Sequence, residues 1–327
     1  MKRGLVIGKF MPVHAGHVAL IRFAAGHCDE LIVSMSYTPD DPIPADLRFG
    51  WLRELVADDA DIKPAMVVDD FDDESLSLPE RTRIWAAFIR RTYPPINILF
   101  SSEPYGAPFA GNLGAEHVLF DEARVKYPVS GTLVRTKPFA YWDYIPAVVR
   151  PYFVKKICFY GAESTGKSFM TERMAQVYNT EFVPEVAREM LTSNDFTLDD
   201  IREIALAHYA RIEQKLKTAN KLLFCDTDAI TTAVYSRHYL HEVPDEVYAM
   251  ERNVTYAVYL MFDVDVPWVA DGLRDLGEKR REMFEVFKAA LETRGIQYIL
   301  VRGDYAERER IVRGVIDGIL EEGGWKK

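Results

Sequence analysis

The sequence of 327 residues lacks several features that mark specialised classes of protein. It has no run of about 18 apolar residues, so we expect no membrane-spanning helix. Its three cysteines, Cys28, Cys158 and Cys225, lie far apart without C-x-x-C spacing, which argues against a disulfide framework or a zinc site. The formal net charge is −10, whereas a nucleic-acid-binding surface normally shows as a basic excess. We therefore expect no nucleic acid among the partners.

The sequence shows no internal repeats or low-complexity segments, and we do not expect its first residues to act as a signal peptide. The first residues, MKRGLVIGKF, join a basic start to an apolar run that is too short for a signal peptide. This run leads into a Gly-Lys turn, so we interpret it as a first strand. Cys158 and Cys225 lie in apolar runs typical of buried strands. Together these observations favour a cytoplasmic protein with reduced cysteines.

Short apolar runs instead alternate with helical stretches along the whole chain. Hydrophobic residues make up 48% of the sequence, which is enough for two α/β domains. In the first half the pattern predicts strands at 5–8, 30–36, 65–68 and 96–101 and helices at 15–25, 45–56 and 80–91. In the second half it predicts strands at 156–160, 221–225, 255–262 and 296–301 and a long helix at 199–218. This alternation is typical of parallel sheets with right-handed crossovers.

Three parts follow from this organisation. We place one domain at residues 1–137, an aromatic linker at 138–153 and a second domain at 154–327. The linker contains three prolines and many rings but little glycine or serine, so we expect it to pack rather than to stay flexible.

The first chemical motif lies between the first strand and the first helix. Two histidines, His14 and His17, stand at i and i+3 where the helix N-terminus offers unpaired N–H groups to an anion. Imidazoles can donate hydrogen bonds to phosphate oxygens, Lys9 adds a charge, and Gly16 leaves room for a nucleotide. A histidine pair of this kind is more often structural when it stands alone.

A second segment, Ser130-Gly131-Thr132-Leu133-Val134-Arg135, opens another helix about a domain's length downstream. Its hydroxyls and guanidinium suit a triphosphate. Together the two segments resemble the HxGH nucleotidyltransferases, and the turn Gly8-Lys9-Phe10 is similar to their nicotinamide-mononucleotide branch. Gly131 stands where related chains often have Ala or Ser, a departure that we expect to be harmless.

This resemblance implies a Rossmann-like fold and a set of site residues. It implies that ATP is bound by Gly8, Lys9, Phe10, His14, His17, Ser130, Thr132 and Arg135, with His14, His17 and Arg135 acting in catalysis. It also implies that Arg48, Trp51 and Ser102 bind nicotinamide mononucleotide (NMN), with Trp51 stacked on the nicotinamide ring. An amphipathic helix with a core tryptophan explains Arg48 and Trp51 equally well. Asp121 and Arg124 are similar to an Asp/Arg pair of the family.

The second chemical motif follows the apolar run at 156–160 and has the full spacing of a P-loop. In such a loop the backbone N–H groups cradle phosphates, the lysine reaches the β- and γ-phosphates, and the serine binds Mg²⁺. We therefore expect a second ATP site, in a P-loop kinase domain with a parallel sheet. Its ATP-binding residues are Gly161, Glu163, Ser164, Thr165, Gly166, Lys167 and Ser168.

Other polar residues surround this loop in sequence. Asp226 ends a strand, where a carboxylate would join Ser168 in holding Mg²⁺. Asp228 suits a riboside, a helix N-cap, or both at once. Further candidates for riboside binding or phosphoryl transfer are Glu185, Arg188, Trp268, Asp271 and Arg274, with Arg274 placed to stabilise the transferring phosphoryl group.

The chain from residue 1 to about 318 resembles NadR-type bifunctional enzymes, through the aromatic stretch 136–142, Asp226-Thr227-Asp228 and Asp271-Gly272-Leu273-Arg274. The resemblance implies that the second domain phosphorylates nicotinamide riboside to NMN and that the first adenylylates NMN to NAD, releasing pyrophosphate. ATP would be the co-substrate and Mg²⁺ the cofactor, with Glu185 or Asp226 as the carboxylate that activates the 5′-hydroxyl. Some relatives carry a DNA-binding helix-turn-helix, for which we see no counterpart. The partners would be ATP, riboside, NMN and NAD, and a homo-oligomer is compatible with the sequence.

Three alternatives stay open at this point. The rival enzyme is a fused pantetheine-phosphate adenylyltransferase and dephospho-coenzyme-A kinase, which has the same architecture but is disfavoured by the Gly8-Lys9-Phe10 turn. A chain that retains one of the two NAD-salvage activities is the second. The third is a nucleotide-sensing protein with degenerate sites, which the intact His14, His17 and Lys167 disfavour.

Overall fold

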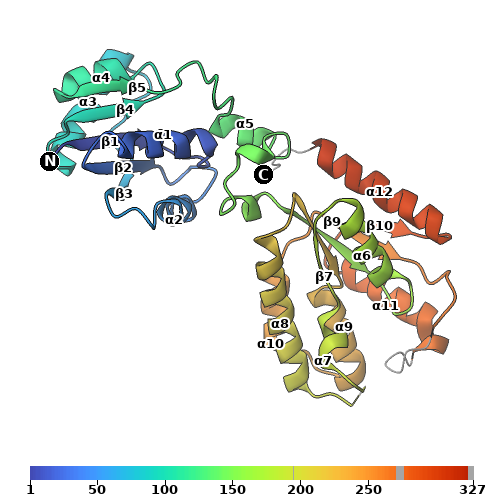
Figure 1. Ribbon diagram of the computed structural model, residues 1–327. Helices are drawn as coiled ribbons and strands as arrows, with labels where there is room; N and C mark the ends of the chain where they lie inside the picture. The colour runs from blue at the N-terminus through green and yellow to red at the C-terminus, as the bar shows by residue number, and fades with distance from the viewer. Residues whose placement is uncertain (194, 270–275, 323–327) are drawn as a thin grey trace. The chain divides into compact units, whose positions relative to one another are not determined.

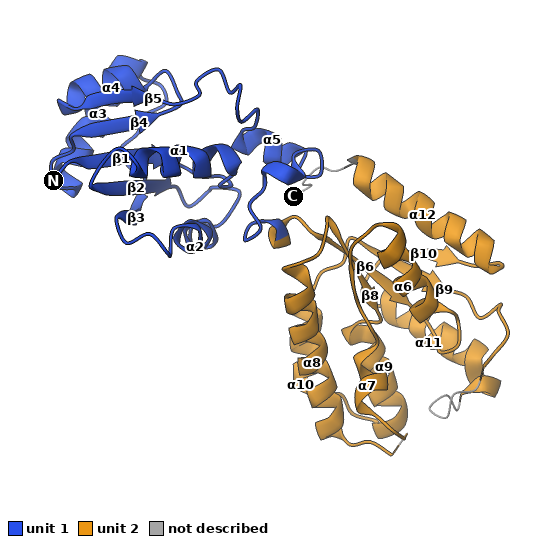
Figure 2. Ribbon diagram, viewed as in Figure 1, with its two compact units in different colours: residues 1–150, 323–327 blue, residues 151–322 orange. Residues whose placement is uncertain are grey.

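The computed structural model describes residues 1–193, 195–269 and 276–322. Within them the chain forms two compact units, Met1–Arg150 and Pro151–Glu322, which are coloured separately in Figure 2. Most of the predicted linker 138–153 thus groups with unit 1, where Phe139 and Trp142 are buried. No helix within the described ranges is both long and apolar enough to cross a membrane.

Unit 1 is a five-stranded parallel sheet covered by helices (Figure 1). Its strands are β1 (Arg3–Gly8), β2 (Glu30–Tyr37), β3 (Ile62–Val68), β4 (Ile98–Ser101) and β5 (Glu116–Leu119), in the order β3-β2-β1-β4-β5. Its helices are α1 (Ala15–Ala25), α2 (Ala45–Leu55), α3 (Leu78–Thr92), α4 (Gly106–Leu113), α5 (Gly131–Thr136) and the 3₁₀ turn η1 (Trp142–Tyr144).

One face of the unit 1 sheet is closed by α3 and α4. Leu5, Ile32 and Leu99 from three strands form a core cluster with Ala86 of α3 and Phe109 of α4. The start of α3 is fixed by a capping box in which the N–H of Ser77 donates to the Glu80 carboxylate at 3.0 Å. The order of strands reverses direction between β1 and β4, and in open α/β sheets ligands bind outside the carboxyl ends of strands at such a point.

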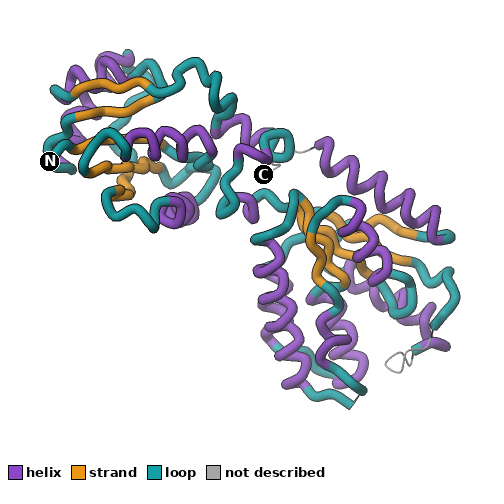
Figure 3. The backbone as a smooth tube through the Cα atoms, in the orientation of Figure 1, coloured by secondary structure: helices purple, strands orange, loops and turns teal. Residues whose placement is uncertain are grey.

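Unit 2 has the same kind of layered architecture (Figure 3). Its parallel strands are β6 (Lys155–Tyr160), β7 (Glu181–Val183), β8 (Leu222–Asp226), β9 (Val258–Phe262) and β10 (Tyr298–Val301), in the order β10-β9-β6-β8-β7. Its helices are α6 (Lys167–Val177), α7 (Val186–Met190), α8 (Leu198–Leu216), α9 (Ala229–Leu240), α10 (Asp245–Asn253), α11 (Arg280–Glu292) and α12 (Tyr305–Glu322), with 3₁₀ turns η2 (Arg150–Tyr152) and η3 (Gly277–Lys279).

Alternate residues of β6 serve two separate cores in unit 2. Ile157 and Phe159 pack with α6 and α12, whereas Cys158 and Tyr160 pack with α9 and α11 on the other face. A central parallel strand covered on both faces must be apolar at consecutive positions, which is why residues 157–160 read as an unbroken apolar run. Cys158 pairs in register with Cys225 of β8, and both are buried as free thiols.

The structure confirms the predicted α/β class with two parallel sheets. Helix α1 has the predicted bounds, and most predicted strands and helices end within one or two residues of those observed. Strand β3 begins three residues earlier than predicted, at Ile62, and so contains Pro64. Because β3 lies at the edge of the sheet, a residue without an N–H donor is tolerated there.

Candidate functional sites

A cleft of about 550 Å³ opens at the carboxyl ends of β1 and β4 in unit 1. All the residues predicted to bind ATP in this domain line it, and so does Ser102 after β4. The segments around His14 and Ser130 are far apart in sequence, so their meeting at one cleft is a result of the fold. The cleft also lies between β1 and β4, where the strand order reverses.

The histidine pair occupies the start of α1. His14 is the N-cap residue, its ring stacks on that of His17 with centroids 3.7 Å apart, and its backbone N–H donates to Nδ1 of His17 at 3.3 Å. Because Nδ1 of His17 accepts, the proton of the neutral ring lies on Nε2 and is available to a ligand.

Both imidazoles are held in the neutral form. Burial, and after it the positive charge of Arg124, lowers the pKa of His14 to about 4. Burial also lowers the pKa of His17 well below its usual value, with smaller effects from His14 and Arg124. A phosphate that enters the cleft would therefore meet neutral N–H donors beside the Arg124 guanidinium.

Arg135 ties the two segments together. Its guanidinium donates to the carbonyl oxygen of Met11 in the histidine loop and, at 3.4 Å, to the hydroxyl of Thr132. Ser130 caps α5 by accepting from the N–H of Leu133 at 3.2 Å. The serine thus supports the helix that carries Arg135.

Gly131 is more tightly constrained than its sequence context suggested. A Cβ atom at this position would lie 2.5 Å from the carbonyl oxygen of Met11. The obstacle is backbone, and the same carbonyl accepts from Arg135, so neither segment can move away without breaking their contact.

We expect Gly131→Ala to lower adenylyl transfer at least tenfold and to cost about 1–3 kcal/mol of unit 1 stability. Both would be measured on the full chain, by product formation and by thermal unfolding. Gly50→Ala is the matched control, because nothing lies within 4 Å of a Cβ atom at that helical position. Full activity in Gly131→Ala would show that the loop yields easily.

A second cavity of about 220 Å³ adjoins the cleft and shares Gly8, Lys9 and Tyr105 with it. Trp85 lines it: the indole N–H donates to Asp72 at 2.9 Å, and the Arg81 guanidinium lies 5.2 Å from the ring centroid. Sequence reasoning missed this aromatic cavity because its lining residues come from β1, β2, β3, α3, α4 and the loops after β3 and β4. A tryptophan on the inner face of an amphipathic helix was the one available signal.

Arg48 and Trp51 are placed differently from the other predicted residues. Arg48 is fully buried and donates to the carbonyl oxygens of Ile43 and Lys9 and to the Asp41 carboxylate. Trp51 is buried, and neither residue lines the cleft or the aromatic cavity. Arg48 therefore supports the turn at Lys9, and a role for the pair in NMN binding stays a prediction.

The P-loop of unit 2 joins β6 to α6. Gly161 has φ 130° and faces the carbonyl oxygen of Phe262, which a Cβ atom would approach to 2.9 Å, so only glycine fits. Gly166 has φ 83° and precedes the first residue of α6, Lys167. Lys167 is buried, and its ammonium group donates to the carbonyl oxygen of Ala162 at 2.8 Å across the loop.

Asp226, the last residue of β8, lies beside the loop, and Glu185 is close to it. Burial, followed by the negative charge of Glu185, raises the pKa of Asp226 to about 6, while Lys167 and a hydrogen bond from Ser168 act in the opposite direction. Oδ1 of Asp226 makes no hydrogen bond within the described part of the chain. A buried carboxylate with an unused oxygen next to a serine hydroxyl fits the oxygen ligands that Mg²⁺ prefers.

A buried arginine, which the sequence did not reveal, supports the P-loop. Arg308 of α12 is fully buried and donates to the carbonyl oxygens of Thr165, Gly303 and Asp263. It also pairs with the Asp265 carboxylate. Its neighbours in sequence, Glu307 and Glu309, are also charged, so nothing in the local pattern sets it apart.

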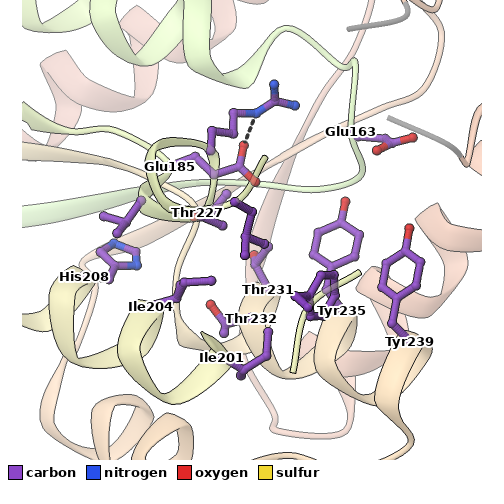
Figure 4. Close-up of a pocket in the computed structure, with 15 residues that line it drawn as sticks. Glu163, Glu185, Ile201, Ile204, His208, Thr227, Thr231, Thr232, Tyr235 and Tyr239 are labelled. Atoms are coloured by element: carbon purple, nitrogen blue, oxygen red, sulfur yellow. Dashed lines mark hydrogen bonds and ion pairs between the residues drawn. The ribbon is translucent and has the colours of Figure 1, made fainter. Parts of the chain in front are cut away.

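A third cavity, of about 100 Å³, lies between α7, α8 and α9 (Figure 4). Glu185 lines it and accepts from Nε of Arg188 at 2.7 Å. Tyr235 and Tyr239 point their hydroxyls toward the side where Glu163 lies, with their rings nearly parallel. Tyrosine rings and carboxylates on one cavity favour a ligand that carries positive charge.

His208 of α8 is buried and lines the same cavity. Nε2 makes no hydrogen bond to any residue that the structure describes. Burial, and after it the charge of Arg211, lowers the pKa of His208 to about 4. The folded chain therefore binds this proton only near pH 4, whereas an unfolded chain does so near pH 6.5.

Lowering the pH from 6.5 to 4 must therefore stabilise the unfolded state relative to the folded state. Between pH 7 and pH 4, we expect the free energy of unfolding to fall by roughly 3 kcal/mol less in His208→Gln than in the wild type. Urea unfolding at the two pH values, with the partly exposed His238→Gln as control, measures it. Identical pH dependence in wild type and His208→Gln would contradict the expectation.

The remaining predicted residues of unit 2 differ in position. Asp228 is buried and caps α9 through the N–H of Thr231 at 2.8 Å, and its other oxygen accepts from Tyr259 at 2.9 Å. It does not line the third cavity, so the structure gives it a capping role, and riboside binding stays a prediction. Trp268 is partly buried near the P-loop segment, where the next residue, Val269, donates to Ser164. Asp271 and Arg274 lie outside the described residues.

The two folds and their sites define the class: a chain that joins an α/β unit of the nucleotidyltransferase kind to a P-loop unit. Residues 156–308 match the family model described as AAA domain. The chain is 31% identical, over 93% of its length and 80% of the relative's, to the trifunctional NAD biosynthesis/regulator protein NadR of Escherichia coli (strain K12). The chain belongs to the NadR family.

Further similarities agree with this assignment. The nicotinamide-nucleotide adenylyltransferase of Methanospirillum hungatei is 32% identical over 46% of this chain and 86% of its own length, a similarity that concerns the N-terminal region. Among solved structures, NadR protein in complex with NR has a TM-score of 0.79 at 23% identity, covering 99% of this chain and 97% of that chain. NadR protein in complex with NAD and AMP-PNP has a TM-score of 0.78 at 24% identity, covering 100% and 97%. These two show that the fold is shared.

Proposed function

We propose that this chain is a bifunctional NAD salvage enzyme. Its second unit phosphorylates nicotinamide riboside with ATP to give NMN, and its first unit adenylylates NMN with a second ATP to give NAD and pyrophosphate. The observation that carries the proposal is that each of the two phosphate-binding motifs stands beside a separate cavity lined by aromatic rings and carboxylates. Such a lining suits a cationic pyridine riboside.

In the first unit the chemistry is adenylyl transfer. A phosphate oxygen of NMN attacks the α-phosphorus of ATP, and the bond to the bridging oxygen of the leaving pyrophosphate breaks. The neutral ring of His17 donates from Nε2, and Arg135 and Lys9 supply positive charge to the β- and γ-phosphates. No covalent intermediate is needed, because position and charge stabilisation account for such transfers.

In the second unit the chemistry is phosphoryl transfer from ATP to the 5′-hydroxyl of the riboside. Lys167 neutralises charge on the β- and γ-phosphates, and Arg274 would do so on the transferred group. We assign the hydroxyl to Glu185, because it lines the third cavity, and we assign Asp226 with Ser168 to Mg²⁺. At that position Asp226 and Ser168 would hold an ion that supplies positive charge to the phosphates. Trp268 and Asp271 remain candidates for the riboside.

The comparisons support this proposal at two levels. The Escherichia coli relative is named for NAD biosynthesis, and the Methanospirillum hungatei relative for nicotinamide-nucleotide adenylyl transfer. The two solved NadR proteins hold NR in one case and NAD with AMP-PNP in the other. Those ligands belong to those proteins, and their transfer to this chain is part of the proposal.

Mass spectrometry of the products tests it. The full chain is incubated with Mg²⁺, ATP and nicotinamide riboside, and we expect NMN with ADP first and NAD with pyrophosphate later. A parallel incubation replaces the riboside with dephospho-coenzyme A or pantetheine phosphate. Turnover of these substrates alone would overturn the assignment, and tight ATP binding without any product would favour a sensor.

A further inference from the structure

Helix α8 presents both apolar and polar surface to the third cavity, in unit 2. Ile201 and Ile204 line the cavity together with His208, which lies one helical turn further along the same face. Leu191 and Phe196 add apolar surface to the same cavity. Such a lining suits a flat aromatic ligand, and the histidine offers a point at which a polar substituent of that ligand can be bound.

Several other polar groups of the cavity already have partners within the chain. Glu185 accepts from Nε of Arg188 at 2.7 Å. The hydroxyl groups of Thr231 and Thr232 donate to Asp228, at 3.0 Å to its carboxylate and at 3.3 Å to its carbonyl oxygen. A ligand that used these groups as donors would have to compete with bonds that the fold has already made.

His208 differs from these groups. Its side chain is buried, and Nε2 makes no hydrogen bond to any residue that the structure describes. Burial lowers the pKa of His208 to about 4, so the ring is neutral near pH 7 and carries one N–H donor and one acceptor nitrogen. A buried polar atom without a partner costs free energy, and a ligand group that pairs with it recovers that cost.

The position of the P-loop sets the orientation of a riboside in this cavity. Glu163 belongs to the P-loop, and Figure 4 shows it on the opposite side of the cavity from His208. The 5′-hydroxyl that receives the phosphoryl group must face the P-loop, so the pyridine ring extends away from it, toward His208. The ring carboxamide is then the group farthest from the phosphate donor. It has both N–H donors and an acceptor oxygen, so it can pair with either tautomer of the imidazole.

We propose that His208 binds the ring carboxamide of the riboside through Nε2 and so determines which pyridine ribosides unit 2 accepts. The inference rests on the proposed function of unit 2 and adds the side chain that recognises the substituent of the ring. His208 is a specificity-determining residue with no part in moving the phosphoryl group, because the 5′-hydroxyl is assigned to Glu185.

The experiment compares kcat/KM of the full chain for nicotinamide riboside and for pyridine riboside, which lacks the carboxamide. Because the analogue leaves Nε2 unpaired, we expect the wild type to prefer nicotinamide riboside by about tenfold or more. In His208→Leu the preference should fall to about threefold or less, through loss of activity toward nicotinamide riboside. His208→Gln keeps a donor and an acceptor and should restore most of the preference.

Glu203→Leu is the matched control, because Glu203 is exposed on the same helix and does not line the cavity. A purely structural role of His208 would lower activity toward both ribosides by the same factor, and this result would contradict the inference. Should His208→Leu not fold, His208→Phe keeps a flat ring without nitrogens and is measured in its place.

The outcomes separate the two levels of the argument. Phosphorylation of neither riboside by the wild type would overturn the proposed function of unit 2 and this inference with it. Equal use of both ribosides by the wild type, or an unchanged preference in His208→Leu, would overturn the inference alone.

Discussion

Lys167→Ala abolishes phosphorylation of nicotinamide riboside and leaves the conversion of supplied NMN to NAD intact: this is the expected result with the largest effect. Lys167 is buried within the P-loop, where its charge has no replacement among its loop neighbours, so we expect a fall of roughly 10²–10³ in kcat or more. The motif that performs adenylyl transfer lies in a different compact unit.

Chromatography of the products from each substrate measures both activities. Lys217→Ala removes an exposed lysine of the same unit and should change neither. Loss of both activities in Lys167→Ala would mean that the two units do not work independently.

His17→Ala has the reverse effect. We expect NAD formation to fall by roughly 10²–10³ while NMN continues to accumulate from the riboside. The substitution removes the Nε2 donor and also the ring that stacks on His14 and accepts its backbone N–H. The loop at the start of α1 therefore loses both a ligand contact and a support.

A quenched time course with riboside and ATP shows this as NMN that is not consumed. His27→Ala is the control, because His27 is exposed on the same unit. Normal NAD formation by His17→Ala would rule out the assigned role of the histidine pair.

The fold could be predicted where the local sequence pattern directly reflects burial in the tertiary structure. Buried central strands such as β6 and β8 are apolar at consecutive positions, and helix α1 begins directly after His14. Helix α4 and strand β5 were not predicted. The sequence of α4, GAPFAGNL, contains two glycines and a proline, and its stability comes from packing of Phe109 and Ala110. Strand β5 is a half-exposed edge strand of four residues.

The sites divide in the same way. The P-loop and the segments around His14 and Ser130 are continuous in sequence, so their positions at strand ends and helix starts could be predicted from the local pattern. The roles of their residues stay predictions. The aromatic cavity could not be predicted, since Asp69, Trp85 and Tyr105 meet only after β3, α3 and the loop after β4 are assembled. Arg48 and Asp228 are the opposite case. Their sequence context suggested ligand binding, but in the structure both are bonded to groups that support a turn or a helix start.

The contact between Arg308 and the carbonyl oxygen of Thr165 joins residues 143 positions apart. On a ribosome, the segment 161–168 leaves the exit tunnel long before its anchor in α12 has been synthesised. Among the described residues of unit 1, the hydrogen bonds of the histidine loop reach no further along the chain than Arg135. A nascent chain should therefore acquire a finished adenylyl-transfer site while its kinase site still awaits the last helix.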